Sequence, residues 1–170
     1  MNVYSVEQDL SIFDLYRKGK GLILNPSELR ISVADEPHND DGKGYSKGKY
    51  SCYELADIQI KGLFNGAPAE GRPFMFYLKI LLEENHRHHV KPIIERNMSY
   101  DRREKGWYVD WDSMSEELKI LCEQTLAQDV SIMLQPITSK SQKKKTKAGY
   151  GDTTLYASGQ LFQAVMVEVE

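Results

Sequence analysis

The helical spacing of apolar residues after Pro73 constrains the fold more than any other feature of this sequence. A proline at the first position of a helix loses no hydrogen bond, because its N–H would have no partner there. The residues that follow repeat at i, i+3, i+4, i+7 and i+8, at Phe74, Tyr77, Leu78, Leu81 and Leu82. This pattern predicts a helix that buries one stripe of its surface.

A second helix is predicted to start at Ser113. Glu116 lies three residues further on, and this spacing is that of a capping box. One side of the helix would then carry the side chains that face the core, at Met114, Leu118, Leu121, Cys122 and Thr125.

Alternating or continuous apolar stretches predict the strands. They occur at 29–33, 53–64, 107–111, 130–137 and 161–169. Pro92 is expected to prevent a helix, so residues 91–97 are predicted to be extended. Strands then outnumber helices without a strict βαβ order. The fold class predicted is α+β, a single domain with a mostly antiparallel sheet, two packed helices and a flexible N-terminal arm.

The length of 170 residues fits one domain. We predict an N-terminal arm or docking segment over residues 1–25, followed by a single α+β domain over 26–170. Two segments rich in glycine or lysine, 37–49 and 139–152, are predicted to be mobile loops within it.

Composition narrows the classes of function. The chain is 41% hydrophobic and 28% charged, which is typical of a soluble globular protein. It has no apolar run near the roughly 20 residues of a membrane span, and we expect no signal peptide. A net charge of −3 excludes a globally basic nucleic-acid binder, and two cysteines supply no disulfide framework. With no GxSxG, P-loop or GxGxxG motif, we expect no enzyme, no cofactor and no metal.

The most unusual segment is rich in lysine. Five lysines fall within eight residues without an acidic neighbour, at Lys140, Lys143, Lys144, Lys145 and Lys147. Removing these five from a chain of net charge −3 leaves −8, so the positive charge is local. Such a segment attracts phosphates of lipid or nucleic acid. A solvated loop without a binding role is the alternative interpretation.

A second candidate surface lies near the N-terminus. Its apolar side chains are Leu10, Ile12, Phe13 and Tyr16. An apolar segment on an arm that cannot join its own core predicts contact with a neighbouring subunit. The alternative is that it forms a first helix packed on the parent domain.

Two other functions remain open from the residues. The lysines could form a sequence-independent RNA-binding surface, as in a viral silencing suppressor, most readily beside a second basic patch at Lys43, Lys47 and Lys49. A small metal-dependent hydrolase could use His86, His88, Asp110 and Asp112. That hydrolase requires strand 107–111 to neighbour the end of the first helix.

The order of elements resembles a known family. A long strand (YELADIQIKGLF), a helix (PFMFYLKILLEE), two strands, a helix and a terminal segment (LYASGQLFQAVMVEVE) follow one another over residues 50–170. This order is similar to that of rhabdovirus matrix proteins, particularly the short ones of plant cytorhabdoviruses. The resemblance rests on this order and on no motif. The proline-tyrosine budding motif of animal-virus relatives is absent, and the basic residues lie at 140–147 instead of in the arm.

The resemblance implies a non-catalytic structural protein. It would self-associate through the N-terminal apolar residues, condense the viral nucleocapsid and bridge it to the inner face of a membrane. The lysine segment would contact the anionic membrane surface or the nucleocapsid, with RNA as a further partner. The expected location is the virion and the host cytoplasm, peripheral to membrane.

Overall fold

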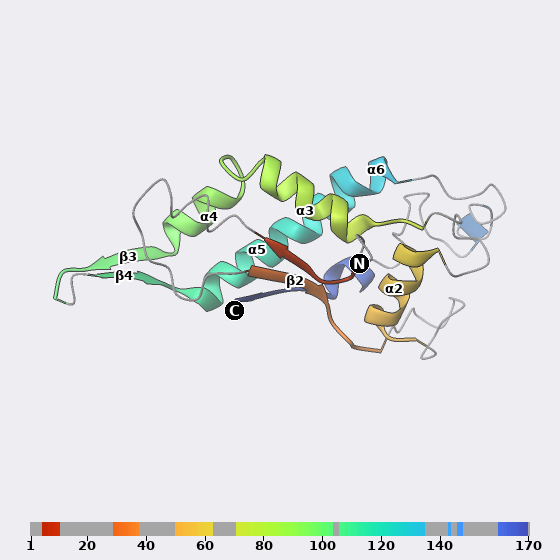
Figure 1. Ribbon diagram of the computed structural model, residues 1–170, viewed down its shortest axis with the longest axis horizontal. Helices are drawn as coiled ribbons and strands as arrows, with labels where there is room; N and C mark the ends of the chain where they lie inside the picture. The colour runs from red at the N-terminus through yellow and green to blue at the C-terminus, as the bar shows by residue number, and fades with distance from the viewer. Residues whose placement is uncertain are drawn as a thin grey trace.

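The computed structural model describes residues 5–10, 29–37, 50–62, 71–103, 106–134, 143, 146–147 and 160–169 (Figure 1). Its named elements are β1 (Gln8–Leu10), β2 (Leu29–Val33), α2 (Cys52–Lys61), α3 (Phe74–Glu84), α4 (Val90–Arg96), β3 (Met98–Asp101), β4 (Gly106–Val109), α5 (Trp111–Thr125), the π-helix η1 (Leu126–Val130), α6 (Ser131–Met133), α8 (Gln160–Gln163) and β5 (Val165–Val169). The mixed α+β class is confirmed. The prediction that sheet dominates is wrong, because helices make up most of the described chain.

The central sheet has three antiparallel strands in the order β1-β2-β5. The strand predicted at 29–33 is confirmed as β2. Ile31 and Val33 are buried, as are their partners Val167 and Val165, so these four side chains form one apolar face. On the opposite face Arg30 lies across from Glu168, which is exposed.

The N-terminal residues belong partly to this sheet. β1 pairs with β2, and Val6 and Gln8 are buried. Residues 6–10 are therefore part of the domain and not a flexible arm. Residues 11–25 of the predicted arm or docking segment lie outside the described residues.

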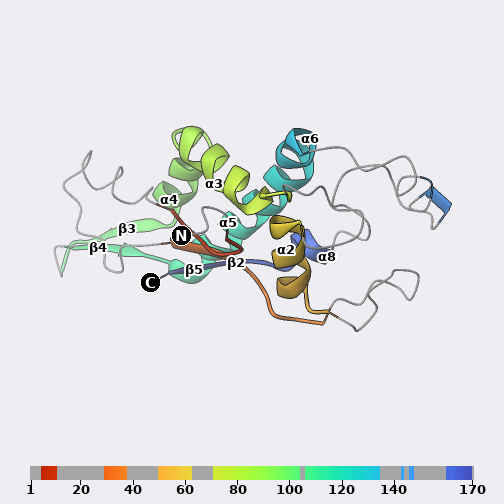
Figure 2. The same ribbon diagram turned by 45° about the vertical axis from the view of Figure 1, so that its right-hand side comes forward.

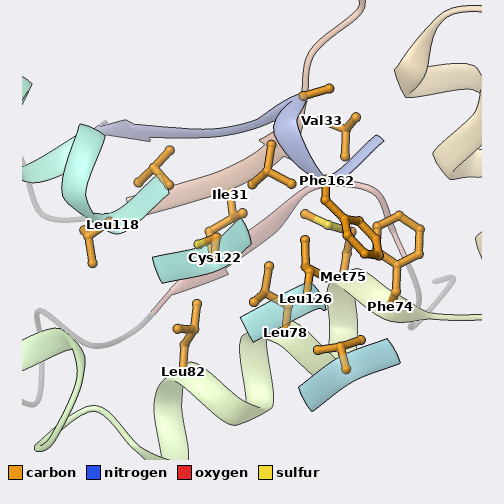
Figure 3. Close-up of a cluster of buried hydrophobic side chains, with 14 of the residues drawn as sticks. Ile31, Val33, Phe74, Met75, Leu78, Leu82, Leu118, Cys122, Leu126 and Phe162 are labelled. Atoms are coloured by element: carbon orange, nitrogen blue, oxygen red, sulfur yellow. The ribbon is translucent and has the colours of Figure 1, made fainter. Parts of the chain in front are cut away.

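Two helices cover the apolar face of the sheet. α3 packs against β1, and α5 packs against β5. Figure 3 shows Leu78 and Leu82 of α3, Leu118 and Cys122 of α5, and Leu126 of η1 in one cluster of buried side chains with Ile31 of β2. The predicted helix after Pro73 is confirmed, with Phe74, Met75, Leu78 and Leu82 buried.

The strand predicted at 53–64 is wrong, because 52–61 form helix α2. Ser51 caps its start: the Ser51 hydroxyl accepts from Glu54 N at 3.1 Å, and Ser51 N donates to Glu54 Oε2 at 2.9 Å. Gly62 ends it with φ of 70°. Cys52, Ala56 and Ile60 are buried at helical spacing, so the helix uses a period of four where the sequence also allowed a period of two.

The extended conformation predicted for 91–97 is also wrong, since 90–96 form helix α4. Pro92 is its third residue. The first four N–H groups of a helix have no partner within the helix, so proline breaks no bond there. The turn that precedes α4 instead supplies its first bonds, from Val90 N and Lys91 N to His86 O.

β3 and β4 form a separate antiparallel hairpin, which projects from one end of the molecule (Figures 1 and 2). The strand predicted at 107–111 is confirmed for 107–109. Trp111 already belongs to α5, whose N-cap is Asp110 and not Ser113. The buried stripe predicted for this helix is confirmed at Met114, Leu118, Cys122 and Thr125.

The last two predicted strands differ from the structure. Residues 130–133 are helical, in η1 and α6, so the strand prediction is wrong there. The C-terminal stretch begins as the short helix α8 and becomes a strand only at Val165. Of the predicted loop 37–49, Pro37 pairs with Ser51 in an isolated bridge, and 38–49 lie outside the described residues.

Candidate functional site

The lysine segment is described at three positions. Lys143, Thr146 and Lys147 are helical and exposed. Both described lysines, Lys143 and Lys147, are therefore open to a negatively charged surface. Figures 1 and 2 place this short blue helical piece at the end of the molecule opposite the β3–β4 hairpin. Lys140, Lys144 and Lys145 lie outside the described residues, as does the second basic patch at 43–49.

Of the predicted self-association residues, the structure describes one. Leu10 is the last residue of β1 and pairs with Leu29. Ile12, Phe13 and Tyr16 lie outside the described residues. The chain therefore enters this apolar segment directly from the edge strand of the central sheet.

The residues considered for a hydrolase do not assemble. Across the described ranges, no three His, Cys, Asp or Glu side chains come together in a way that could hold a metal ion. His86 Nδ1 lies 2.7 Å from Glu83 O, within its own turn. Asp110 is a helix cap: its Oδ1 accepts from Ser113 N at 3.1 Å, and Ser113 Oγ donates to its Oδ2 at 2.8 Å. These bonds lower the pKa of Asp110.

Neither cysteine is activated as a nucleophile. Cys52 and Cys122 are both buried and free. Burial raises the pKa of Cys52 to about 11, with a smaller contribution from Glu36. Burial raises the pKa of Cys122 to about 12, with a smaller contribution from Glu123. Since the thiolate is the reactive form, both side chains are structural near neutral pH.

Sequence reasoning missed a buried arginine. Arg72 is 5% exposed, and its Nη1 donates to Gln59 Oε1 at 2.9 Å. Its backbone N donates to Gln59 O at 2.7 Å, so Arg72 joins the end of α2 to the start of α3. Its Nε is buried without a hydrogen-bond partner in the described structure. Burial lowers the pKa of Arg72. No spacing in the sequence marks this residue, because its burial depends on how α2 packs.

The sequence also gave no sign of which apolar side chains remain on the surface. Within the described ranges, the large exposed ones are Tyr100, Ile120, Ile132 and Met133. The described helices include none that is both long and apolar enough to cross a membrane.

No protein-family model, curated protein or solved structure matches this chain.

Proposed function

We propose that this protein is a structural protein of the viral matrix type, which self-associates, condenses the nucleocapsid and bridges it to the inner face of a membrane. It would act in the virion and the host cytoplasm, peripheral to membrane and without catalysis. The observation that supports this proposal most directly is the lysine segment. Its described lysines, Lys143 and Lys147, are both exposed.

The charge distribution favours binding in one orientation. Without the five lysines the chain is strongly acidic, so an anionic bilayer attracts this segment and repels much of the remaining surface. Each lysine near such a surface contributes about 1 kcal/mol. Five lysines therefore give binding that is reversible and falls with salt, as a scaffold that assembles and disassembles requires.

The first test is flotation with phosphatidylserine vesicles, at low and at near-physiological salt, with neutral vesicles as the control. Salt-sensitive flotation with the anionic vesicles alone supports the proposal. Absence of flotation at both salt concentrations contradicts membrane attachment. Retention of single-stranded RNA in a parallel filter assay would then favour the RNA-binding alternative.

A charge-reversal pair assigns the contact to residues. Lys143→Glu, Lys144→Glu and Lys145→Glu together should abolish flotation and leave the free energy of unfolding within about 0.5 kcal/mol of the wild type. The matched control carries Arg87→Glu, Arg102→Glu and Lys119→Glu, which changes the net charge equally but at other sites. Equal losses in both variants would show that net charge, and not the lysine segment, governs binding.

Self-association needs a test that leaves the sheet intact. Deletion of residues 1–16 would remove β1 and the buried Val6, so a smaller assembly would not identify an interface. Phe13→Ser with Tyr16→Ser leaves β1 in place and should lower the mass measured by light scattering. Ile120→Ser, an exposed apolar position on α5, is the control. An unchanged mass in the double variant contradicts this role.

A further inference from the structure

Two adjacent apolar side chains are exposed to solvent at the end of α6, the short helix that follows α5 and η1. Ile132 is 80% exposed and Met133 is 51% exposed, both in α6. They are the most exposed of the large apolar side chains in the described structure. Leu134 directly after them is buried again, at 6% exposed, so the helix end is still packed on the domain.

The spacing of the buried side chains accounts for this exposure. The buried apolar side chains repeat every four residues from α5 through η1 to the residue after α6, at Met114, Leu118, Cys122, Leu126, Val130 and Leu134. The turn η1 has i→i+5 bonding and so contains one extra residue. Asp129, Ile132 and Met133 lie between these buried positions and are exposed.

The neighbouring charges indicate what covers this pair. The lysine segment begins at residue 139, only six residues after Met133. Figures 1 and 2 show α6 and the described residues of the lysine segment, 143 and 146–147, in the same half of the molecule, away from the hairpin. A surface with both exposed apolar side chains and clustered lysines complements an anionic bilayer, whose headgroups attract lysine and whose acyl boundary accepts isoleucine and methionine.

We infer that Ile132 and Met133 insert into the bilayer beside the lysine segment, as the apolar half of one membrane contact. This inference rests on the membrane attachment proposed above and specifies how it is achieved. Lysines alone give weak, salt-labile binding, and stable peripheral attachment generally needs a second, apolar signal. The pair supplies that signal, and it should be the part of the affinity that persists in high salt.

Site-specific fluorescence tests the insertion. Met133→Cys carries an environment-sensitive dye, and the native thiols do not compete because Cys52 and Cys122 are buried. Addition of phosphatidylserine vesicles should shift the emission to the blue, and nitroxide-labelled lipids should quench it. The same dye at Ile120→Cys, also on an exposed apolar position, should show neither change.

Affinity measurements complete the test. Ile132→Ser with Met133→Ser should weaken vesicle binding about tenfold at about 0.5 M salt, where the contribution of lysine is largely screened. Ile120→Ser should bind as the wild type does. The serine variants keep the net charge and replace exposed side chains, so we expect the fold to be retained, and circular dichroism checks this.

Three results would overturn the inference. If the wild type floats with vesicles but the dye at 133 does not respond, the lysines bind without insertion and only the further inference fails. If the wild type does not float at all, the proposed function fails with it. If the emission shifts with protein concentration in the absence of lipid, the pair contacts a second copy of the chain instead.

Discussion

The carboxylate of Glu117 holds the guanidinium of Arg96, with 2.7 Å between Oε2 and Nε. Its other oxygen, Oε1, accepts from Asn97 Nδ2 at 3.1 Å. Asn97 O in turn accepts from Asp110 N at 2.9 Å. One acidic side chain on α5 therefore fastens the end of α4 and the base of the β3–β4 hairpin to the domain.

We expect the two sides of this contact to respond unequally to substitution. Glu117→Ala removes both hydrogen bonds and should lower the free energy of unfolding by about 1–2 kcal/mol. Arg96→Ala should cost only about 0.5 kcal/mol, because the arginine side chain is 60% exposed and Asn97 still holds Glu117. Urea unfolding measures both values. Equal losses would mean that Asn97 contributes little.

Gly71 should be among the least replaceable residues of the chain. Its φ is 72°, and a Cβ at this position would overlap the carbonyl oxygen of Ile60. Gly71→Ala therefore combines left-handed strain with a backbone clash, and should cost about 4 kcal/mol or more. Gly62→Ala has a similar φ of 70° at the end of α2 and should cost about 1 kcal/mol. Thermal unfolding of the two variants compares them, and similar melting temperatures would contradict the clash.

Asp110 should contribute to stability at neutral pH and lose that contribution in acid. Its folded pKa lies below the ordinary value of 3.8, chiefly because the Ser113 backbone N–H donates to it. A lowered folded pKa means that the contribution is complete above 3.8 and disappears as the pH falls through the folded value. Asp110→Asn keeps a capping oxygen without the charge. The free energy of unfolding, measured from pH 6 to pH 2, should therefore fall less steeply in Asp110→Asn than in the wild type. Parallel curves for the two proteins would exclude this contribution of Asp110.

The two thiols should be protected in the folded protein. With pKa values raised to about 11 and about 12, and with both side chains buried, almost no thiolate is accessible at pH 8. Ellman's reagent should therefore react at the rate of unfolding, and two equivalents should react at once in guanidinium. A rapid reaction of one equivalent in the native state would contradict the burial of Cys52 or Cys122.

The parts of the fold that the sequence predicted correctly are those with a single possible period. Residues 29–33 alternate and form β2, and the stripe from Phe74 to Leu82 fits only a helix. Residues 53–64 satisfy two periods, because Ala56, Ile58 and Ile60 alternate while Cys52, Ala56 and Ile60 are spaced by four. The capping box at Ser51 and Glu54 favours the helix there, and the serine and glutamate three residues apart were visible in the sequence.

Other features follow from packing and could not be predicted from local patterns. Pro92 is tolerated in α4 because the helix starts at Val90. The proline then lies in the first turn, where a backbone N–H has no partner within the helix. Residues 130–133 are apolar enough for a strand but continue a helix through a π turn. The lysine segment was apparent from charge alone. A strand over these residues would place Ile132 on the same face as the buried Val130 and Leu134, so the strand prediction concealed the exposure of Ile132.

The pairing of β2 with β5 has a consequence for how the chain folds. The two strands are about 130 residues apart in sequence, yet they form the middle and one edge of the same sheet. Closing so large a loop is entropically costly, and contacts of such long range slow folding. α3 and α5 can therefore associate early through local contacts, but β2 gains its second neighbour only after residues 165–169 have emerged from the ribosome. Until then one edge of β2 is unpaired, and the nascent chain is open to pairing with another strand.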